Sequence, residues 1–482
     1  MEKPEEKSEE TMKSCSLFTD KKYQYGPCCA YKEREIVERA PKSVLTYYPV
    51  GSGKTLSALH AARVFLDSNP SGRVFVFTTK SNIDTSWSDN IHKYNVNEQP
   101  ECDLGRIQVQ NIDWWFSQSV LPHYNRLIRL MSIKSSNHRA AYVDIPWLTL
   151  LRDAKRTLKK SEWSPFKDII DENNRSFLDA CIPSERYMLI VDECQQYLNY
   201  TSHQQLISKF CQHSYFTILL SATPLNDSEQ EGGLCRMLRS RQLHNRILFI
   251  PTQDDMVAVH HRYIGAKMST DETRAFLTTK KDDAYLTKGR QLCNTTTKFT
   301  KILKYIGTKT VIYSFFRENG VDGFFKFLSN TLECVVQSQY SLILSINARK
   351  IHVRIFSDAK KDIQWFNRTS SKNKMLLITS KAQLGISLVG VQFFHIMEPQ
   401  WTYTDEAQAI GRVTRIGSHQ EGDTVTVFHW VSTAGRYESS DEIVRHSMEQ
   451  KKQRTDNVLK QYQQRGGEYL QYLLNKFGIY SI

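Results

Sequence analysis

One short segment constrains the fold most: Pro49-Val50-Gly51-Ser52-Gly53-Lys54-Thr55. An apolar stretch ends near Tyr48 and an amphipathic stretch, Leu56–Asp67, follows the segment, so the pattern predicts a strand, a glycine turn and a helix that begins at Lys54. The backbone N–H groups of such a turn and the helix N-terminus surround a small concavity that suits phosphate oxygens. The glycines are needed because the backbone must come close to the anion. We call Gly51–Thr55 the phosphate loop.

Two side chains of the phosphate loop have the chemistry that a nucleotide requires. Lys54 is expected to reach the β- and γ-phosphates of ATP, and the hydroxyl of Thr55 is expected to bind Mg²⁺. The full pattern GxxxxGK[ST] is not met, because Tyr48 stands where its first glycine would be. The loop alone therefore leaves a chance glycine turn open as an alternative, and other motifs must decide.

Several short runs rich in Val, Ile, Leu and Phe, each bounded by polar or turn residues, predict buried strands of parallel sheets. These runs are Arg73–Thr78, Tyr187–Val191, Thr217–Leu220, Thr310–Ser314, Lys374–Thr379 and Phe393–Met397. Amphipathic stretches such as Tyr403–Ile410 lie between them, so the chain is predicted to have an α/β fold. The runs form two groups, which predicts two parallel-sheet domains in tandem.

The pattern along the chain gives five segments. We predict a disordered N-terminal segment at 1–19, a first domain at 20–245 with a helical insertion at about 105–184, a linker with helical content at 246–296, a second domain at 297–431, and a helical tail at 432–482. Within the tail, a helix over Ser447–Gln464 is predicted to break at Gly466-Gly467 before a second helix, Glu468–Lys476.

Charge and cysteine usage bound the partners and the compartment. The 482 residues contain 64 Lys and Arg against 51 Asp and Glu, a net charge of +13, which favours a polyanion partner such as nucleic acid. A basic protein with no such partner is the alternative. The ten cysteines form no CxxC pair and there is no apolar run of about 18 residues, so we expect a soluble protein with reduced thiols, without a membrane partner, inside a cell or in a virion.

An acidic pair follows the second apolar run of the first group. Asp192 can hold Mg²⁺, through water, and Glu193 can act as general base toward the attacking water. The alternative for two carboxylates is a solvated acidic turn. Their position directly after a buried strand favours the catalytic interpretation.

Two further groups complete the pattern. Ser221 and Thr223 follow the next apolar run, and their hydroxyls could link the acidic pair to the second domain. Arg412 and Arg415 are three residues apart, so on a helix they would share one face and point together across a cleft. Arginines from a facing domain offset the charge that builds on the γ-phosphate during phosphoryl transfer.

This ordered set resembles the superfamily 2 helicase-type ATPases, and within them the Snf2-like branch, over residues 20–430. The matching segments are Pro49–Thr55 (motif I), Asp192–Gln195 (motif II), Ser221–Thr223 (motif III) with Pro224-Leu225-Asn226 as the Snf2 extension, and Gln408–Arg415 (motif VI). Trp87 matches the tryptophan that often follows motif Ia, and Tyr23-Gln24 is similar to an upstream pair whose glutamine reads adenine. The resemblance implies two RecA-like domains, with Gln24 contacting the base.

The run from Leu384-Gly385-Ile386-Ser387-Leu388 through Glu398-Pro399-Gln400-Trp401 to Gln408–Arg415 is similar to the nucleoside triphosphatase I and early transcription factor ATPases of large DNA viruses. That resemblance implies nucleotide contacts from Gly385 and Gln408, DNA translocation linked to transcription, and an RNA polymerase or transcription-machinery partner. Gln195 stands where the viral proteins usually have His, and Ser380 where many relatives have Thr. Gln195 is expected to couple ATP to nucleic acid together with Ser221 and Thr223.

The sequence therefore predicts a nucleic-acid-stimulated ATPase that uses ATP and Mg²⁺ and translocates on DNA rather than RNA. Two alternatives stay open. One is an ATP-dependent RNA helicase, and the other is a non-hydrolysing scaffold that binds nucleic acid or a polymerase. The direction of movement, strand separation, the partner of the tail and the oligomeric state do not follow from the residues.

Overall fold

The computed structural model describes residues 22–79, 82–83, 87–97, 104–112, 156, 159, 182–198, 202–225, 227–240, 243, 246–250, 257–278, 285–346, 348–368, 372–380, 386–415, 417–420, 422–477 and 479. They divide into two compact units. Unit 1 takes its described residues from within Met1–Pro49, Gly53–Pro251 and Asn457–Ile482, and unit 2 from within Val50–Ser52 and Thr252–Asp456. Among the described helices, none has both the length and the apolar character needed to cross a membrane.

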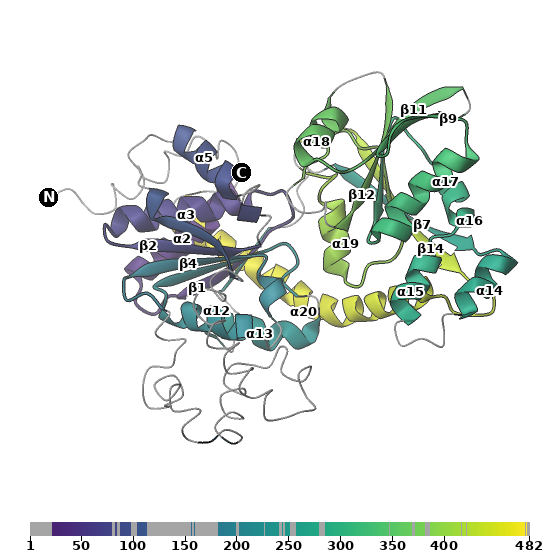
Figure 1. The fold of residues 1–482 in the computed structure, drawn as a ribbon. Helices are drawn as coiled ribbons and strands as arrows, with labels where there is room; N and C mark the ends of the chain where they lie inside the picture. Colours follow the sequence, from purple (N-terminus) through teal and green to yellow (C-terminus); the bar gives the residue numbers. More distant parts are fainter. Residues whose placement is uncertain are drawn as a thin grey trace. The chain divides into compact units, whose positions relative to one another are not determined.

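Unit 1 is built around a sheet whose six described strands are all parallel, in the order β3-β2-β4-β5-β1-β6 (Figure 1). Its strands are β1 (Ser43–Tyr47), β2 (Arg73–Thr78), β3 (Ile107–Asn111), β4 (Tyr187–Asp192), β5 (Phe216–Ser221) and β6 (Ile247–Phe249). Its helices are α2 (Gly26–Ile36), α3 (Lys54–Ser68), α5 (Ser88–Asn97), α12 (Ser202–His213) and α13 (Glu231–Met237), with short 3₁₀ turns η2 (Lys22–Tyr25), η4 (Leu104–Arg106), η7 (Cys194–Tyr197) and η8 (Ser228–Gln230). Every residue of β1, β4 and β5 is buried, which explains their continuous apolar sequences.

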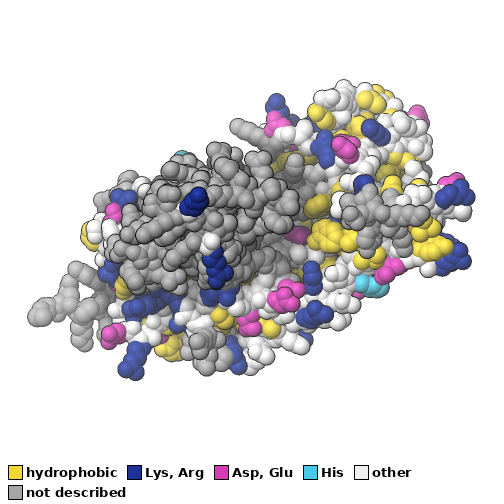
Figure 2. All heavy atoms as spheres, turned by 60° about the horizontal axis from the view of Figure 1, so that its bottom comes forward, with side chains coloured by type: hydrophobic (Ala, Val, Ile, Leu, Met, Phe, Trp, Pro, Cys, Tyr) yellow, Lys and Arg dark blue, Asp and Glu magenta, His cyan; other side chains and the backbone are white. Residues whose placement is uncertain are grey.

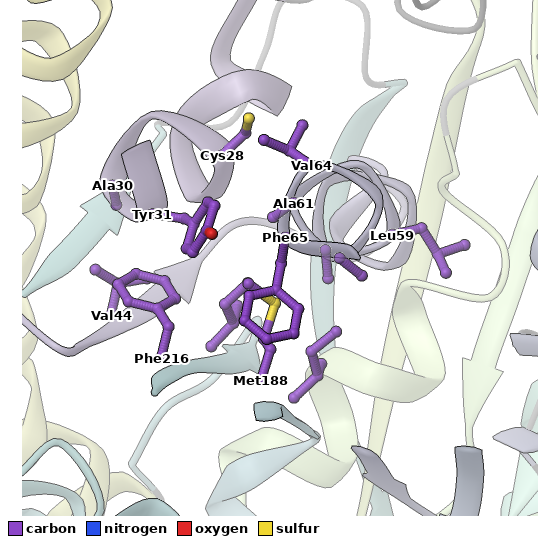
Figure 3. Close-up of a cluster of buried hydrophobic side chains, with 14 of the residues drawn as sticks. Cys28, Ala30, Tyr31, Val44, Leu59, Ala61, Val64, Phe65, Met188 and Phe216 are labelled. Atoms are coloured by element: carbon purple, nitrogen blue, oxygen red, sulfur yellow. The ribbon is translucent and has the colours of Figure 1, made fainter. Parts of the chain in front are cut away.

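Helices cover both faces of this sheet. On one face, Tyr31 of α2 and Phe65 of α3 pack over Val44 and Phe216 of the strands (Figure 3). On the other face, Phe210 of α12 packs edge-on against strand residues, and its ring centroid lies 4.9 Å from that of Phe77. The sheet is therefore sandwiched between two apolar layers, and its polar residues are left at the strand ends.

Unit 2 has its own sheet, with eight described strands in the order β7-β14-β13-β8-β12-β11-β10-β9. The strands are β7 (Ala258–Lys267), β8 (Lys309–Ser314), β9 (Cys334–Ser338), β10 (Ser341–Ile346), β11 (Arg349–Ile355), β12 (Asn373–Thr379), β13 (Phe393–Ile396) and β14 (Thr424–Thr433). The helices are α14 (Thr270–Thr278), α15 (Tyr285–Leu292), α16 (Thr296–Ile302), a π-helical turn η10 (Arg317–Asp322), α17 (Gly323–Thr331), α18 (Ala359–Asn367) and α19 (Tyr403–Ile410). From β7 through β14, β13, β8 and β12 to β11, neighbouring strands pair in parallel. Strand β10 then pairs antiparallel with β11, and β9 pairs antiparallel with β10.

The predicted α/β fold with parallel sheets is confirmed, and all six predicted strands are present, as β2, β4, β5, β8, β12 and β13. The sequence did not predict the antiparallel hairpin strands β9 and β10, which extend the second sheet beyond its parallel part. The apolar runs of these strands, Val335-Val336 in β9 and Leu342-Ile343-Leu344 in β10, are only two and three residues long.

The segment expected to be a linker, 246–296, instead supplies an edge strand to each sheet. Residues Ile247–Phe249 form β6 in unit 1, and Ala258–Lys267 form β7 in unit 2. Strand β7 has mostly exposed side chains, which explains its polar sequence. The expected insertion at 105–184 and the N-terminal segment 1–19 lie largely or wholly outside the described residues, and the described start of the insertion is the strand β3 rather than a helix.

The tail forms one continuous helix, α20 (Ser440–Lys476), so the predicted break at Gly466-Gly467 was wrong. A Cβ atom at Gly466 would lie 2.8 Å from Cβ of Phe249 and 2.9 Å from Cγ2 of Ile247, so this glycine allows the helix to lie close to β6. Packing has overridden the low helix propensity of glycine here. The residues of α20 up to Asp456 belong to unit 2, and those from Asn457 belong to unit 1.

Glu33 of α2 fixes the C-terminal part of α20 within unit 1. Its buried carboxylate accepts hydrogen bonds from the hydroxyls of Tyr469 (2.9 Å) and Tyr472 (3.0 Å) and from Nζ of Lys476 (3.0 Å). Tyr462 packs into the apolar core beside β6 and donates its hydroxyl to Glu231 at 2.8 Å. The end of the tail is therefore an integral part of unit 1.

Candidate active site

The phosphate loop joins the carboxyl end of β1 to the N-terminus of α3, as the sequence predicted. Gly51 and Gly53 have φ angles of 82° and 89°, in the left-handed region that favours glycine. A Cβ atom at Gly53 would lie 2.4 Å from Nε2 of Gln24, so any side chain here would collide with that amide. The glycine at this position therefore lets Gln24, the predicted adenine contact, lie against the loop.

Lys54 is the first residue of α3, and its ammonium lies over the loop that precedes it. Nζ donates to the carbonyl oxygens of Tyr48 at 3.1 Å and Pro49 at 2.9 Å. Thr55 follows on the first turn of the helix and is half-buried. The side chain of Tyr48, which replaces the first glycine of the usual pattern, is buried in the apolar core with Leu248 and Leu470. Tyr48 therefore contributes to the packing of the core.

Asp192 ends β4, and its carboxylate is buried under a set of donors. Its Oδ2 accepts hydrogen bonds from Oγ1 of Thr78 at 3.0 Å, Nδ2 of Asn82 at 3.3 Å and Nε1 of Trp87 at 3.0 Å. Oδ1 accepts from the backbone N–H of Glu193 at 3.0 Å. These four donors are all neutral, so they orient the carboxylate without an ion pair.

Glu193 has a backbone conformation that is rare for its residue type. Its φ and ψ angles are 50° and 47°, in the left-handed region, where a side chain other than that of Gly, Asn or Asp is uncommon. Strained residues of this kind cluster at functional sites. In this conformation the carboxylate of Glu193 contacts the side chain of Gln195.

A chain of hydrogen bonds leads from Glu193 to the next strand. Nε2 of Gln195 donates to Oε2 of Glu193 at 2.6 Å, and Oγ of Ser221 donates to Oε1 of Gln195 at 2.7 Å. The backbone N–H of Thr223 then donates to Oγ of Ser221 at 3.0 Å. Gln195 is 1% exposed and Ser221 is fully buried, so both carry little freedom to move independently. The three residues predicted to couple the site are thus physically connected.

The neighbouring thiol does not belong to this network. Cys194 is completely buried beside the acidic pair, and burial raises the pKa of its thiol well above the ordinary value. A neutral buried thiol is a packing group rather than a nucleophile. The apolar side chain between Glu193 and Gln195 therefore anchors the turn in the core.

These elements lie at one edge of the sheet. Strands β2, β4, β5 and β1 are parallel neighbours, with Val191 opposite Phe77, Asp192 opposite Leu220, and Ser221 opposite Tyr47. Their carboxyl ends, and with them Thr78, Asp192, Ser221 and the phosphate loop, are therefore at the same edge. Ligands of open α/β sheets bind at this edge.

The base-contact region beside the phosphate loop is held by an aromatic set. Tyr25, next to Gln24, meets His60 of α3 edge-on, with ring centroids 5.3 Å apart. Nδ1 of His60 lies 3.2 Å from the hydroxyl of Tyr94. Burial lowers the pKa of His60 to about 3, so the ring is neutral and acts as a packing group with one polar contact. Sequence reasoning did not identify His60 or Tyr94.

The predicted residues of unit 2 lie on and after α19. Gln408 is on the helix, but Arg412 and Arg415 follow its last residue, Ile410. The expectation that both arginines share a helix face was wrong, because the chain turns after Ile410, with Val413 N–H bonded to the Ile410 carbonyl oxygen at 2.9 Å. Gly385 lies outside the described residues.

Sequence reasoning missed two of the donors to Asp192, Thr78 and Asn82, and included Trp87 only through resemblance. A single Thr or Asn has no distinctive sequence pattern. The one available signal was position: Thr78 ends a predicted strand, and parallel strands bring their carboxyl ends together.

Among the described residues, no group of three or more His, Cys, Asp or Glu side chains is arranged to hold a metal ion. Mg²⁺ fits the predicted residues nonetheless, because proteins commonly bind it through one or two oxygen ligands together with the phosphates of a nucleotide. Buried Asp192 offers a carboxylate, and the positive φ angles of the loop glycines provide a concave backbone for phosphate.

Family models match both halves of the chain. Residues 17–226 match the type III restriction enzyme res subunit model, and residues 293–417 match the helicase conserved C-terminal domain model. The chain carries the domain pair of a superfamily 2 helicase. The first helicase domain contains the phosphate loop and Asp192-Glu193, and the second contains α19 and the two arginines.

Two curated proteins are similar to parts of this helicase chain. A protein of Acanthamoeba polyphaga mimivirus, named as an ATP-dependent RNA helicase, is 30% identical over 173 residues, which cover 32% of this chain and 35% of that protein. The uncharacterised helicase of killer plasmid pGKL-2 of Kluyveromyces lactis is 24% identical over 244 residues, 42% of this chain and 38% of its own length. The matches thus span little more than a third of either relative.

Two solved structures are similar to most of this helicase chain. The DUF1998 helicase MrfA bound to DNA has a TM-score of 0.44 and 13% identity, covering 88% of this chain and 50% of that one. The helicase domain of Pyrococcus furiosus Hef has a TM-score of 0.42 and 11% identity, covering 86% and 96%.

Proposed function

We propose that this chain is a nucleic-acid-stimulated ATPase that couples ATP hydrolysis to translocation on DNA. The observation that carries the proposal is the hydrogen-bonded path Glu193-Gln195-Ser221-Thr223, which starts at the predicted general base. The path lies at the same sheet edge as the phosphate loop and the buried carboxylate of Asp192. A site that only bound nucleotide would not need this connection.

In the proposed reaction, the phosphate loop binds the phosphates of ATP through its backbone N–H groups. Lys54 exchanges the carbonyl oxygens of Tyr48 and Pro49 for phosphate oxygens. Asp192 and Thr55 would hold Mg²⁺, which would supply Lewis-acid polarisation of phosphate oxygens. Glu193 takes the proton of the attacking water, and the arginines Arg412 and Arg415 offset charge on the γ-phosphate.

Gln195 and Ser221 link the general base to the turn that holds Thr223. A shift of that turn would move Ser221 and Gln195 and thereby change the position of the Glu193 carboxylate. This provides a physical route by which nucleic-acid binding could raise the hydrolysis rate. Gln408 and Gly385 are proposed as further nucleotide contacts, because the run from Leu384 to Arg415 is similar to the viral ATPases.

An ATP-dependent RNA helicase is the second candidate, because the mimivirus relative is named as one. A steady-state ATPase assay with single-stranded DNA, duplex DNA and RNA as separate activators distinguishes the two. The proposal predicts stimulation by DNA, and stimulation by RNA alone would select the second candidate. A role in transcription, with an RNA polymerase partner, rests on the viral resemblance and would be tested by co-purification from infected or plasmid-bearing cells.

Two variants test hydrolysis itself. Lys54→Ala is expected to abolish turnover, whereas Arg412→Ala is expected to keep ATP binding and to lower turnover on the order of a thousandfold. ATP binding should be measured with a fluorescent analogue in the same samples. If wild-type protein binds ATP but shows no turnover at saturating DNA, the chain is a non-hydrolysing scaffold instead.

A further inference from the structure

Strand β11 has one apolar face and one basic face. Ile351, Val353 and Ile355 alternate along the strand and are buried in the core of unit 2. Between them, Lys350 is exposed, and His352 and Arg354 are half-buried, on the opposite face of the sheet. The sequence therefore lines one side of this strand with positively charged or ionisable groups.

This basic side continues across the neighbouring strands. His352 is opposite Lys374 of β12, which is in turn opposite Lys309 of β8, so basic residues on three adjacent parallel strands form one row. On the other side, His352 is opposite Ile343 of β10, and Ile343 is opposite Val335 of the edge strand β9. Val335 is 66% exposed, so the row changes from basic to apolar as it approaches the sheet edge.

The two lysines of the row are structural, and exposed cations surround them. Nζ of Lys374 donates to the carbonyl oxygens of Trp365 (2.7 Å), Phe366 (3.3 Å) and Arg368 (2.5 Å), which end α18. Nζ of Lys309 donates to the carbonyl of Val389 at 2.9 Å. These contacts hold both ammonium groups against backbone carbonyl oxygens.

The exposed cations are Arg368, directly after α18, and Lys372, directly before β12. We call Lys350, His352, Arg354, Arg368 and Lys372 the basic face. Arg354 is the member with an acidic neighbour, since its Nη1 lies 3.6 Å from Oδ1 of Asp362, and its guanidinium also lies 4.5 Å from the ring centroid of Trp365.

Electrostatic effects on two residues show that positive charge accumulates here. The pKa of Lys374 is lowered to about 8, first by burial and then by repulsion from Lys309, Arg368, Arg354 and Lys372. The pKa of His352 is lowered by burial and then by Lys372, Arg354, Lys374 and Lys350. The charged neighbours with the largest effects on these two pKa values are cations. Like charges held this close are a cost to folding that an anionic ligand would relieve.

The basic face lies away from the motif residues of unit 2. Lys372 and Lys374 are at the start of β12, whereas Ser380, which stands where many relatives have Thr, follows its end, and a strand of this length spans roughly 20 Å. We propose that the basic face is a second nucleic-acid-binding surface. It binds the phosphate backbone of a nucleic-acid strand near the amino end of β12, whereas the motif residues follow the carboxyl end. It goes beyond the proposed function because it needs neither ATP nor the motif residues.

Nucleic acid fits this surface better than an acidic protein segment for two reasons. The cations lie on β11 and in the segments that follow α18 and precede β12, so they are spread over two neighbouring strands, which suits a polymer with regularly spaced charges. The imidazole of His352, with Ile343 and the exposed Val335 beyond it, offers flat and apolar surface for unstacked bases. Backbone contacts of this kind would be independent of base sequence.

The test is equilibrium binding of a fluorescein-labelled 20-nucleotide DNA strand to the full chain without ATP, measured by anisotropy over a range of salt concentrations. The variant is Lys350→Glu with Lys372→Glu, two exposed residues outside the proposed catalytic machinery. We expect affinity at low salt to fall at least tenfold, and the slope of log K against log salt to become shallower by about 1.4, the contribution of two phosphate contacts on a single strand.

The matched control is Lys304→Glu with Lys326→Glu, which makes the same charge change in unit 2. Both lysines are exposed, next to or on helices α16 and α17, whose Phe299 and Phe324 pack on the apolar side of the sheet. An equal loss of binding in the control would overturn the proposal, since it would show a general charge effect. An unchanged slope in the Lys350/Lys372 variant would also overturn it.

Two further outcomes separate this inference from its alternatives. Displacement of the DNA by polyglutamate as efficiently as by unlabelled DNA at equal charge would refute the nucleic-acid assignment in favour of an acidic protein. Because the assay contains no ATP, the binding result is independent of hydrolysis. A wild-type protein that fails as an ATPase can still confirm the basic face, and an active ATPase can still refute it.

Discussion

Each unit buries one carboxylate at the end of a sheet strand, and the two are held in different ways. In unit 1, Asp192 is bonded to Thr78, Asn82 and Trp87, which are all neutral. In unit 2, Glu398 follows β13, is fully buried, and accepts from Oγ of Ser314 at 2.9 Å, from the backbone N–H of Phe315, and from Nδ2 of Asn294 at 3.1 Å.

Two cations lie close to the second carboxylate and lower its pKa against the effect of burial. Nζ of Lys298 donates to the carbonyl oxygen of Met397 at 2.8 Å and pairs with buried Asp441 at 2.9 Å, next to Glu398. Nη2 of Arg290 donates to the carbonyl oxygen of Pro399. Glu398 is thus part of a network of internal charges that holds β8, α16 and the start of α20 together. Neutral donors orient Asp192, and we propose that its charge is used to bind a ligand, whereas Glu398 has a structural role.

The largest effect is expected from Asp192→Asn. It should lower ATP hydrolysis on the order of a hundredfold or more, because it removes the charge that the site presents to a metal ion. Stability should change by only about 1 kcal/mol, because the amide still offers an oxygen to Thr78, Asn82 and Trp87. Steady-state hydrolysis and urea unfolding of the same sample measure both. If Asp192→Asn hydrolyses ATP at the normal rate, the proposed difference between Asp192 and Glu398 is wrong.

Glu398→Ala is expected to act on stability. It leaves the Phe315 N–H, the Ser314 hydroxyl and the Asn294 amide without their acceptor in a buried network, at a cost of about 3 kcal/mol. Urea unfolding followed by circular dichroism gives the value. Glu333→Ala, an exposed glutamate of the same unit, is the control and should change stability by less than about 0.5 kcal/mol. If Glu398→Ala keeps full stability but loses hydrolysis, the structural role assigned to Glu398 is wrong.

Trp87→Phe is expected to have a smaller effect that sharpens the comparison. The ring still fills its buried position, but the N–H that orients Oδ2 of Asp192 is lost. We expect hydrolysis to need about tenfold more Mg²⁺, as for other groups that orient a metal ligand. The matched control is Trp430→Phe, whose buried indole donates to Nδ1 of His395 at 3.1 Å in unit 2. It should leave the Mg²⁺ dependence unchanged.

The comparison also explains how much of the molecule could be predicted from sequence. Strands such as β4 and β5 were found because burial on both faces makes them continuously apolar, and Asp192 stood out as the acidic end of such a run. Glu398 was noted only within a motif resemblance. Its network joins Asn294, Lys298, Ser314 and Asp441, which are far apart in the chain, and no local pattern marks such a set.

The strand and the helix that the sequence predicted wrongly also have physical explanations. Strand β7 was missed because an edge strand with exposed side chains has a polar sequence. The helix α20 was divided in error at Gly466, where local propensity is poor but close packing against Ile247 and Phe249 requires a residue without a side chain. Local rules describe the chain well only where tertiary contacts do not oppose them.

The smallest expected effect is a pH dependence of stability that comes from Glu398. Burial raises the pKa of Glu398 above its ordinary value of 4.5, despite the opposing influence of Lys298 and Arg290. A carboxyl whose pKa is raised by folding contributes its full stability below pH 4.5, and this contribution is lost as pH rises through the folded-state pKa. The unfolding free energy of wild type relative to Glu398→Gln should therefore fall as pH increases from 4.5, by at most about 1.4 kcal/mol for each unit by which the pKa is raised. Urea unfolding of both proteins between pH 4.5 and 8 measures the difference. A difference that does not vary with pH would contradict the prediction, because it would show that Lys298 and Arg290 compensate burial completely.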